Sequence, residues 1–155
     1  MQARLATQDD IDQLCVLARE FIEESQYGWT YYDLAARTRF EWLIKDEACD
    51  VIVVDGENEL AGLAIVSCER DFMQELLGYI SKFYVKPKYR GTGVGRLLVD
   101  EVSKWLHTKG CQSAFFTAAG NISVEKDKMM ANLFKKFGYK EQGVCLAMEL
   151  DGICK

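Results

Sequence analysis

The residues best suited to chemistry are three glycines at alternate positions, Gly91, Gly93 and Gly95. A predicted strand over 80–85 precedes them, and Pro87 ends this strand because proline has no N–H to donate to a neighbouring strand. Glycines let the backbone take left-handed conformations and approach a ligand closely. A helix is predicted to follow, and its first N–H groups point back toward the loop with the positive end of the helix dipole behind them. This arrangement predicts a site that holds phosphate.

Basic residues surround these glycines. Between residues 82 and 96 there are five basic side chains and no acidic one, whereas the whole chain carries a net charge of −5. An acidic protein that concentrates positive charge beside a glycine loop is expected to bind an anion there. The alternative is a solvated, lysine-rich turn that its glycines keep tight. The five basic residues are Lys82, Lys86, Lys88, Arg90 and Arg96.

Three phosphate-binding patterns compete for this loop. The P-loop pattern G-x-x-x-x-G-K-[ST] is excluded, because no Gly-Lys-Ser/Thr follows a suitable glycine. The dinucleotide pattern G-x-G-x-x-G would require glycine at position 96, which is Arg96. The pattern R/Q-x-x-G-x-G/A is matched by Arg90, Gly93 and Gly95. With its predicted strand and helix, the stretch YVKPKYRGTGVGRLLVDEV resembles the acyl-CoA pyrophosphate loop of the GNAT superfamily of N-acetyltransferases.

The composition predicts one globular domain over residues 1–155. Its 155 residues can bury an ordinary core, and 49% hydrophobic with 28% charged residues is typical of globular proteins. The sequence has neither an apolar run long enough to cross a membrane nor a signal-peptide pattern at its start, so we expect a cytoplasmic protein. Six cysteines without metal-ligand spacing and the single His107 predict neither a zinc site nor a disulfide framework, so no metal is expected.

Hydrophobic periodicity and turn signals predict an α/β domain. Thr7 with Asp10 predicts a capped first helix, and Gly110 predicts the end of the helix after the glycine loop. The helix that begins near residue 124 is expected to bury Met129 and Phe134 on one face. The expected order is strand 2–6, a helix to about 24, helix 31–45, hairpin strands 51–54 and 59–68, strand 76–85, a helix from 94, strand 113–118, helix 124–137, and one or more strands over 139–150.

This order of elements is similar to that of GNAT proteins, so the resemblance covers nearly the whole chain. The segment MMANLFKKFGYKEQG resembles the closing helix and strand of the family through Ala131, Phe134 and Gly138-Tyr139. The resemblance implies a GNAT-like mixed, splayed central sheet of six to seven strands with about four flanking helices. It also implies acetyl-CoA as the co-substrate.

The resemblance further implies how acetyl-CoA would lie. The end of the strand before Pro87 is expected to run along the pantetheine, where a main-chain N–H would polarise the thioester carbonyl. Amides of the glycine loop are expected to cradle the pyrophosphate, and two residues of the closing helix to add contacts. The expected cofactor-binding residues are Phe83, Tyr84, Val85, Arg90, Gly91, Thr92, Gly93, Val94, Gly95, Arg96, Asn132 and Lys135.

The implied acceptor is a primary amine, which must lose a proton before it attacks. For a lysine-like amine with a pKa of about 10.4, the neutral form at pH 7 costs roughly 4.6 kcal/mol. A carboxylate normally helps as a general base. The chain departs from the family here, because Ser81 stands where many members carry a glutamate base. Phe134 stands where many members carry a tyrosine that protonates the leaving thiolate.

Other side chains could replace both groups. Glu75 or Glu69 could act as the base through water, and Tyr139 or Tyr84 could act as the acid. Each of these could instead be an ordinary surface or core residue. A coenzyme A thiol with a pKa of about 8.5 leaves without much help, so the acid is the less necessary partner. The predicted catalytic residues are Glu75, Ser81 and Tyr139.

Four aromatic residues lie between the first two predicted helices, in the segment SQYGWTYY at 25–32. Aromatic side chains on a connecting segment often line a small-molecule site. The family resemblance implies that this region forms one wall of the acceptor site. The alternative is that these rings cover the edge of the core. The predicted substrate-binding residues are Tyr27, Trp29, Tyr31 and Tyr32.

The residues and the resemblance together favour an acetyl-CoA-dependent N-acetyltransferase acting on a primary amine of a small molecule or protein. The acidic chain favours a cationic acceptor and argues against nucleic acid, and no membrane partner is expected. One alternative is a non-catalytic acyl-CoA-binding sensor or interaction module, which Ser81 and Phe134 support and the aromatic segment opposes. Another is a different nucleotide-anion binder that ignores the pantetheine arm. An exposed closing strand could pair across a homodimer.

Overall fold

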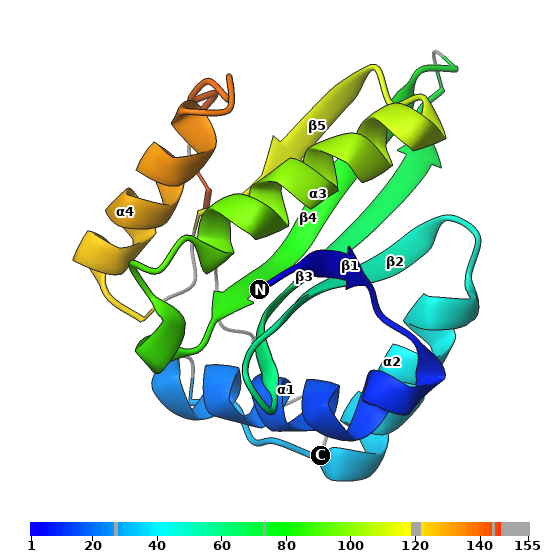
Figure 1. Cartoon of the computed structure of the whole chain (residues 1–155). Helices are drawn as coiled ribbons and strands as arrows, with labels where there is room; N and C mark the ends of the chain where they lie inside the picture. The colour runs from blue at the N-terminus through cyan, green and yellow to red at the C-terminus, as the bar shows by residue number, and fades with distance from the viewer. Residues whose placement is uncertain (27, 73, 119–121, 144, 147–155) are drawn as a thin grey trace.

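The computed structural model describes the chain except residues 27, 73, 119–121, 144 and 147–155. The described residues form an α/β fold with one mixed five-stranded sheet in the order β1-β2-β3-β4-β5 (Figure 1). The first four strands are antiparallel to their neighbours, and β5 joins β4 in parallel. The strands are β1 (Ala3–Leu5), β2 (Cys49–Asp55), β3 (Leu60–Arg70), β4 (Leu76–Val85) and β5 (Ser113–Phe116). The helices are α1 (Ile11–Glu24), α2 (Asp33–Lys45), α3 (Val94–Lys109) and α4 (Val124–Lys135).

The sheet is covered on both faces, which gives the molecule two hydrophobic cores. Leu63 and Tyr84 face the side of α1 and α2, whereas Ala64 and Phe83 face the side of α3 and α4. Four consecutive residues of β2, Val51–Val54, are completely buried, as expected for a strand enclosed by helices on both sides. In the described ranges, no helix is long and apolar enough to span a bilayer.

The predicted helix boundaries are confirmed at three residues that favour them physically. The Asp10 carboxylate accepts a hydrogen bond from the Thr7 N–H at 2.7 Å, so the predicted pair does begin the first helical segment. Gly93 and Gly110 flank α3 with left-handed backbone angles, φ 96° and φ 79°. A residue with a Cβ atom would be strained in either conformation.

The prediction of six to seven strands was wrong for the described part of the chain, which forms five. The expected closing strand over 139–150 lies partly outside the described residues, and its described residues 139–143 and 145–146 form no strand. Gly143 has a left-handed backbone with φ 78°. This conformation turns the chain where a strand would have to stay extended.

The last helix differs from its prediction in length and in burial. It ends at Lys135, two residues before the predicted end. Phe134 is its only buried residue, whereas Met129 is 70% exposed. The stripe that α4 buries is therefore narrower than the apolar periodicity predicted, because α4 packs at the side of the sheet beyond β5 (Figure 1).

The substitution Gly62→Ala tests the close contact between β3 and β4. A Cβ atom at this position would lie 2.6 Å from the main-chain oxygen of Tyr84, which cannot rotate away. We expect the variant to lose about 1–3 kcal/mol of unfolding free energy. Urea denaturation should show a lower midpoint with an unchanged slope. An unchanged midpoint would mean that the two strands separate without cost.

Candidate functional site

The parallel pairing of β4 with β5 stops partway along β4 and leaves the rest of its edge open. β5 pairs with β4 only from Leu77 to Ile80, whereas β3 follows β4 as far as Val85. On the side of β5, the described part of the chain provides no strand for the edge from Ser81 to Val85. An open edge offers main-chain groups to an extended ligand.

A β-bulge lies where this opening begins. Ile65 of β3 pairs with Lys82, and the next β3 residue pairs with Ile80. Ser81 is therefore the extra residue of the bulge, and its hydroxyl donates to the Ile65 carbonyl at 3.5 Å. The bulge places Ile80 and Phe83 in the same core although they are three residues apart. The predicted catalytic residue Ser81 thus lies at the inner end of the opening.

Alternation along β4 decides which peptide groups face the opening. The Lys86 N–H donates to the Ala61 carbonyl of β3 at 3.0 Å. The N–H and C=O groups of successive residues in a strand point to opposite sides. The peptide groups of Phe83 and Val85 therefore point away from β3, into the opening. The Val85 carbonyl accepts a hydrogen bond from Arg90 Nε at 3.0 Å. Phe83 is therefore the residue whose peptide groups a strand-like ligand could pair with.

The glycine loop continues directly from the open edge of β4. Gly91 and Gly93 have left-handed backbones, with φ 77° and φ 96°, and a Cβ atom at either would have no neighbour within 4 Å. A Cβ atom at Gly95 would lie 3.1 Å from the Leu133 side chain, so this glycine lets α3 approach α4. The first hydrogen bond within α3 runs from the Leu97 N–H to the Gly93 carbonyl. The amides that precede it point toward the loop, as at other anion-binding helix N-termini.

Carboxylates from other elements offset much of the positive charge of the loop. Lys86 is 7% exposed and binds Glu20 at 3.0 Å and Glu59 at 2.6 Å. Lys88 pairs with the second oxygen of Glu59. The hydrogen bonds from Lys86 and Lys88 hold the pKa of the Glu59 carboxyl at about 2. An anion bound at this loop would therefore rely more on main-chain amides than the sequence predicted.

Glu24, the last residue of α1, joins four elements of the site. Its two oxygens accept hydrogen bonds from the two terminal nitrogens of Arg90, each at 2.6 Å. Lys126 of α4 donates to Glu24 at 2.6 Å, and the Tyr84 hydroxyl of β4 donates at 3.2 Å. The Arg90 hydrogen bonds, followed by Lys126, hold the pKa of the Glu24 carboxyl at about 2 against the opposing effect of burial. Sequence reasoning missed Glu24, because it lies 66 residues from Arg90.

An aromatic cluster fills the space between β4, β5 and α4. Phe134 is 2% exposed and stacks on Phe116 with ring centroids 3.9 Å apart. Phe83 and Tyr139 contact the Phe134 ring edge to face, at 5.2 and 5.1 Å. Burial raises the pKa of Tyr139, so its hydroxyl stays protonated at neutral pH, as a proton donor must. The predicted acid therefore lies behind Phe134, within the same cluster as Phe83.

The structure does not bring Glu75 to the opening. Glu75 is exposed at the start of β4, where its N–H donates to Asp71 at 2.9 Å. It precedes Ser81 by six residues, which is about 20 Å along a strand. Glu69 lies at the same distant end, paired with Leu77. Within the described residues, no three His, Cys, Asp or Glu side chains form a group that could hold a metal ion.

Two expected contacts on α4 lie on its exposed side. Asn132 and Lys135 are both exposed, and Lys135 forms an ion pair with Glu141 at 3.0 Å. Their neighbour Phe134 points into the core. Lys126, in the first turn of α4, is the α4 cation that contacts Glu24 beside the glycine loop.

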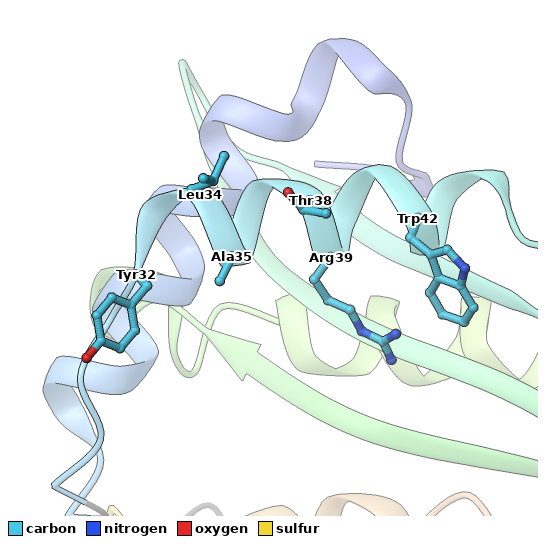
Figure 2. A pocket seen from close by; sticks show the side chains of 6 residues that line it. All are labelled: Tyr32, Leu34, Ala35, Thr38, Arg39 and Trp42. Carbon is cyan, nitrogen blue, oxygen red and sulfur yellow. The ribbon is translucent and has the colours of Figure 1, made fainter. Parts of the chain in front are cut away.

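The predicted acceptor-binding aromatics are divided between two surroundings, and Tyr27 lies outside the described residues. Tyr31 turns toward α1, where Arg19 lies over its ring at 5.0 Å and its hydroxyl donates to Asp33 at 3.0 Å. Trp29 and Tyr32 are 50% and 68% exposed. Tyr32 begins a shallow hollow along the outer surface of α2 (Figure 2). The residues that line this hollow are Tyr32, Leu34, Ala35, Thr38, Arg39 and Trp42.

Comparison with known proteins gives one consistent family. A model described as the acetyltransferase (GNAT) family matches residues 16–139. An uncharacterized N-acetyltransferase of Archaeoglobus fulgidus is 26% identical over 113 residues, which are 68% of this chain and 73% of that protein. An aminoglycoside N(6')-acetyltransferase type 1 of Stenotrophomonas maltophilia is 32% identical over 60 residues, 36% of this chain. This second match spans only 39% of that relative.

Solved structures with low sequence identity share the fold. An integron cassette protein from the mobile metagenome of Cole Harbour Salt Marsh has a TM-score of 0.78 at 20% identity, over 97% of this chain and 91% of that one. An aminoglycoside acetyltransferase from an uncultured soil sample, in complex with sisomicin, has a TM-score of 0.74 at 17% identity, over 97% and 96%. A predicted acetyltransferase of Clostridium acetobutylicum with acetyl-CoA has a TM-score of 0.74 at 18% identity, over 96% and 95%.

The substitution Glu59→Gln tests the ion pairs beneath the glycine loop. Lys86 would lose one of its two carboxylate partners, so we expect a lower free energy of unfolding at neutral pH. The folded pKa of Glu59 is about 2, below the ordinary 4.5. Its stabilising effect is therefore complete above pH 4.5 and is lost as the pH falls toward 2. Urea denaturation at several pH values should show the largest difference from the wild type at neutral pH.

Glu57→Gln is the matched control, because Glu57 is exposed in the turn before β3. This variant should follow the wild type over the same pH range. A difference between wild type and Glu59→Gln that does not shrink toward pH 2 would contradict the assignment.

Proposed function

The chain belongs to the acetyltransferase (GNAT) family, and on this basis we propose that it is an acetyl-CoA-dependent N-acetyltransferase that acts on a primary amine. The open edge of β4 from Ser81 to Val85, which leads straight into the glycine loop, carries the proposal. It combines peptide groups for an extended arm with helix N-terminal amides for a pyrophosphate. The match to acetyltransferases by sequence and by fold supports it.

Acetyl-CoA would enter with its pyrophosphate against the amides of residues 93–96, because the N–H groups of Arg90 and Thr92 already donate to the carbonyls of Pro87 and Tyr89. The pantetheine would then follow the open edge, where the peptide groups of Phe83 face the opening. The acetyl group would then lie near the bulge at Ser81. A main-chain N–H at the open edge would polarise the thioester carbonyl and stabilise the oxyanion that forms on attack.

The reaction transfers an acetyl group from sulfur to nitrogen. The neutral amine attacks the thioester carbonyl carbon, a C–N bond forms, and the C–S bond breaks as coenzyme A leaves as a thiolate. The attacking nitrogen releases one proton, and the thiolate takes one up from solvent or from an acid. Tyr139 is the proposed acid, although a thiolate whose thiol has a pKa of about 8.5 leaves without much help.

The proposed general base, Glu75, lies far from the opening. Glu75 is about 20 Å from Ser81 along β4, so it can act only through an extended chain of water molecules. The Ser81 hydroxyl lies at the opening and could hold the first water of such a chain. We therefore propose that the acceptor binds mainly as the neutral amine, which favours acceptors with amine pKa values below that of lysine.

The comparisons and the net charge support one class of acceptor. One relative and one structural neighbour are named as aminoglycoside acetyltransferases. Aminoglycosides carry several amines and are cationic, which suits a chain with a net charge of −5. We propose a polyamine-type small molecule of this kind, bound near the exposed Trp29 and Tyr32.

A non-catalytic acyl-CoA-binding module is the second candidate. Phe134 favours it, because phenylalanine carries no hydroxyl that could protonate the thiolate. Its ring instead packs against Phe116 and Phe83. This protein would bind acetyl-CoA with the same loop and edge but transfer nothing.

The substitution Gly93→Asp tests the cofactor loop. It places a carboxylate and a Cβ atom where the pyrophosphate would bind, so we expect calorimetry to detect acetyl-CoA binding by the wild type and none by the variant. Gly110→Asp is the matched control, because it imposes similar strain at the other end of α3. The control should lose stability and keep its affinity. Equal loss of affinity in both variants would show that strain alone causes it.

A panel of amines tests the reaction. Purified protein and acetyl-CoA are incubated with aminoglycosides, amino sugars and amino-terminal peptides, and mass spectrometry measures the gain of one acetyl group. We expect transfer to at least one cationic amine, with a rate that rises with pH until the acceptor amine is neutral. Binding of acetyl-CoA without transfer to any member would support the non-catalytic module instead.

A further inference from the structure

The three charges of Arg90, Glu24 and Lys126, here called the ion triad, meet where α1, the glycine loop and α4 come together. Figure 1 shows the end of α1, the start of α3 and the start of α4 at the same corner of the molecule. A carboxylate at the end of a helix is unfavourable by itself, because it faces the negative end of the helix dipole. Two cations offset this effect, and the triad keeps a net charge of +1.

Within the triad, Arg90 donates hydrogen bonds from all three nitrogens of its guanidinium group. Its terminal nitrogens bind both oxygens of Glu24, and its Nε donates to the Val85 carbonyl at the open edge of β4. Arg90 is also the residue that begins the glycine loop. Its two-point ion pair therefore fixes how the loop leaves β4, since a guanidinium held by both oxygens of a carboxylate cannot rotate freely.

Lys126 is held by fewer contacts than Arg90. It makes a single hydrogen bond to Glu24, and its side chain is 43% exposed, whereas that of Arg90 is 31% exposed. If the Lys126 ammonium turned toward an anion, Glu24 would still be neutralised by Arg90. The ammonium is thus held beside the loop by a hydrogen bond to Glu24 that costs little free energy to break.

We propose that Glu24 is a positioning residue of the acyl-CoA site, which holds Arg90 against the open edge of β4 and Lys126 beside the glycine loop, ready for a cofactor phosphate. This inference rests on the proposed function. It assigns Lys126, rather than Lys135 of the same helix, as the α4 cation that contacts the cofactor. It also explains why a carboxylate stands so close to a site for anions.

The substitution Glu24→Gln tests the proposal by the sign of its effect. Removal of one negative charge beside an anion site would tighten acetyl-CoA binding if electrostatic attraction alone mattered. Loss of positioning has the opposite effect, and we expect binding about 10-fold weaker, as when outer-shell partners of other preorganised sites are removed. Calorimetry on folded protein gives this affinity. Glu23→Gln, the exposed neighbour on α1, is the matched control and should bind like the wild type.

A second set of variants keeps the test decisive if Glu24→Gln does not fold. Lys126→Met should weaken acetyl-CoA binding several-fold more than Lys128→Met, which removes an exposed lysine of the same helix. Arg90→Gln combined with Glu24→Gln should bind no more weakly than the weaker of the two single variants, because the two residues act as one unit.

The outcomes separate this inference from the proposed function. Absence of binding by the wild type would overturn both. Binding by the wild type together with equal or tighter binding by Glu24→Gln would overturn the role of Glu24 alone, as would equal effects of Lys126→Met and Lys128→Met.

Discussion

The early end of the parallel pairing between β4 and β5 is the constraint on which the site depends. After Ile80 the two strands separate, and among the described residues β3 alone continues beside β4. Unpaired peptide groups are costly when they are buried, so this edge must stay accessible or receive a ligand. The glycine loop, the end of α1 and the start of α4 all lie at this edge, and the ion pairs of Glu24 hold them there.

The distribution of charge bears on how this acidic protein would hold an anion at the glycine loop. Lys86, Lys88 and Arg90 are paired with carboxylates of α1 and of the turn between β2 and β3, so they fix the backbone of the loop more than they attract an anion from a distance. Arg96, 77% exposed with Asp100 at 4.0 Å, remains more available. Such a site would gain its selectivity from the placement of main-chain amides. Salt weakens the interaction of an anion with these amides less than its interaction with exposed charges.

The sequence predicted what local chemistry determines. The glycine spacing, Pro87 and the pair Thr7 and Asp10 located the loop and two helix boundaries, because each acts within a few residues of itself. Glu24 could not be found this way, since its partners are distant in sequence and α1 offers several similar carboxylates. The predictions of a closing strand and of a buried Met129 failed for a related reason. The apolar residues of an element do not reveal which of its sides packs against another element.

The bulge at Ser81 also marks the position at which β4 can change in length. It shifts the alternation of side chains once, so that Ile80 and Phe83 share one core and Tyr84 faces the other. Deletion of Ser81 would close the bulge and leave β4 paired with β3 in unbroken alternation, because Ile80 already pairs with Val66 and Lys82 with Ile65. Phe83 would still face α3, and Tyr84 would still face α1. The strand can therefore lose this one residue over evolution without exchanging its two faces, whereas a second deletion would exchange them.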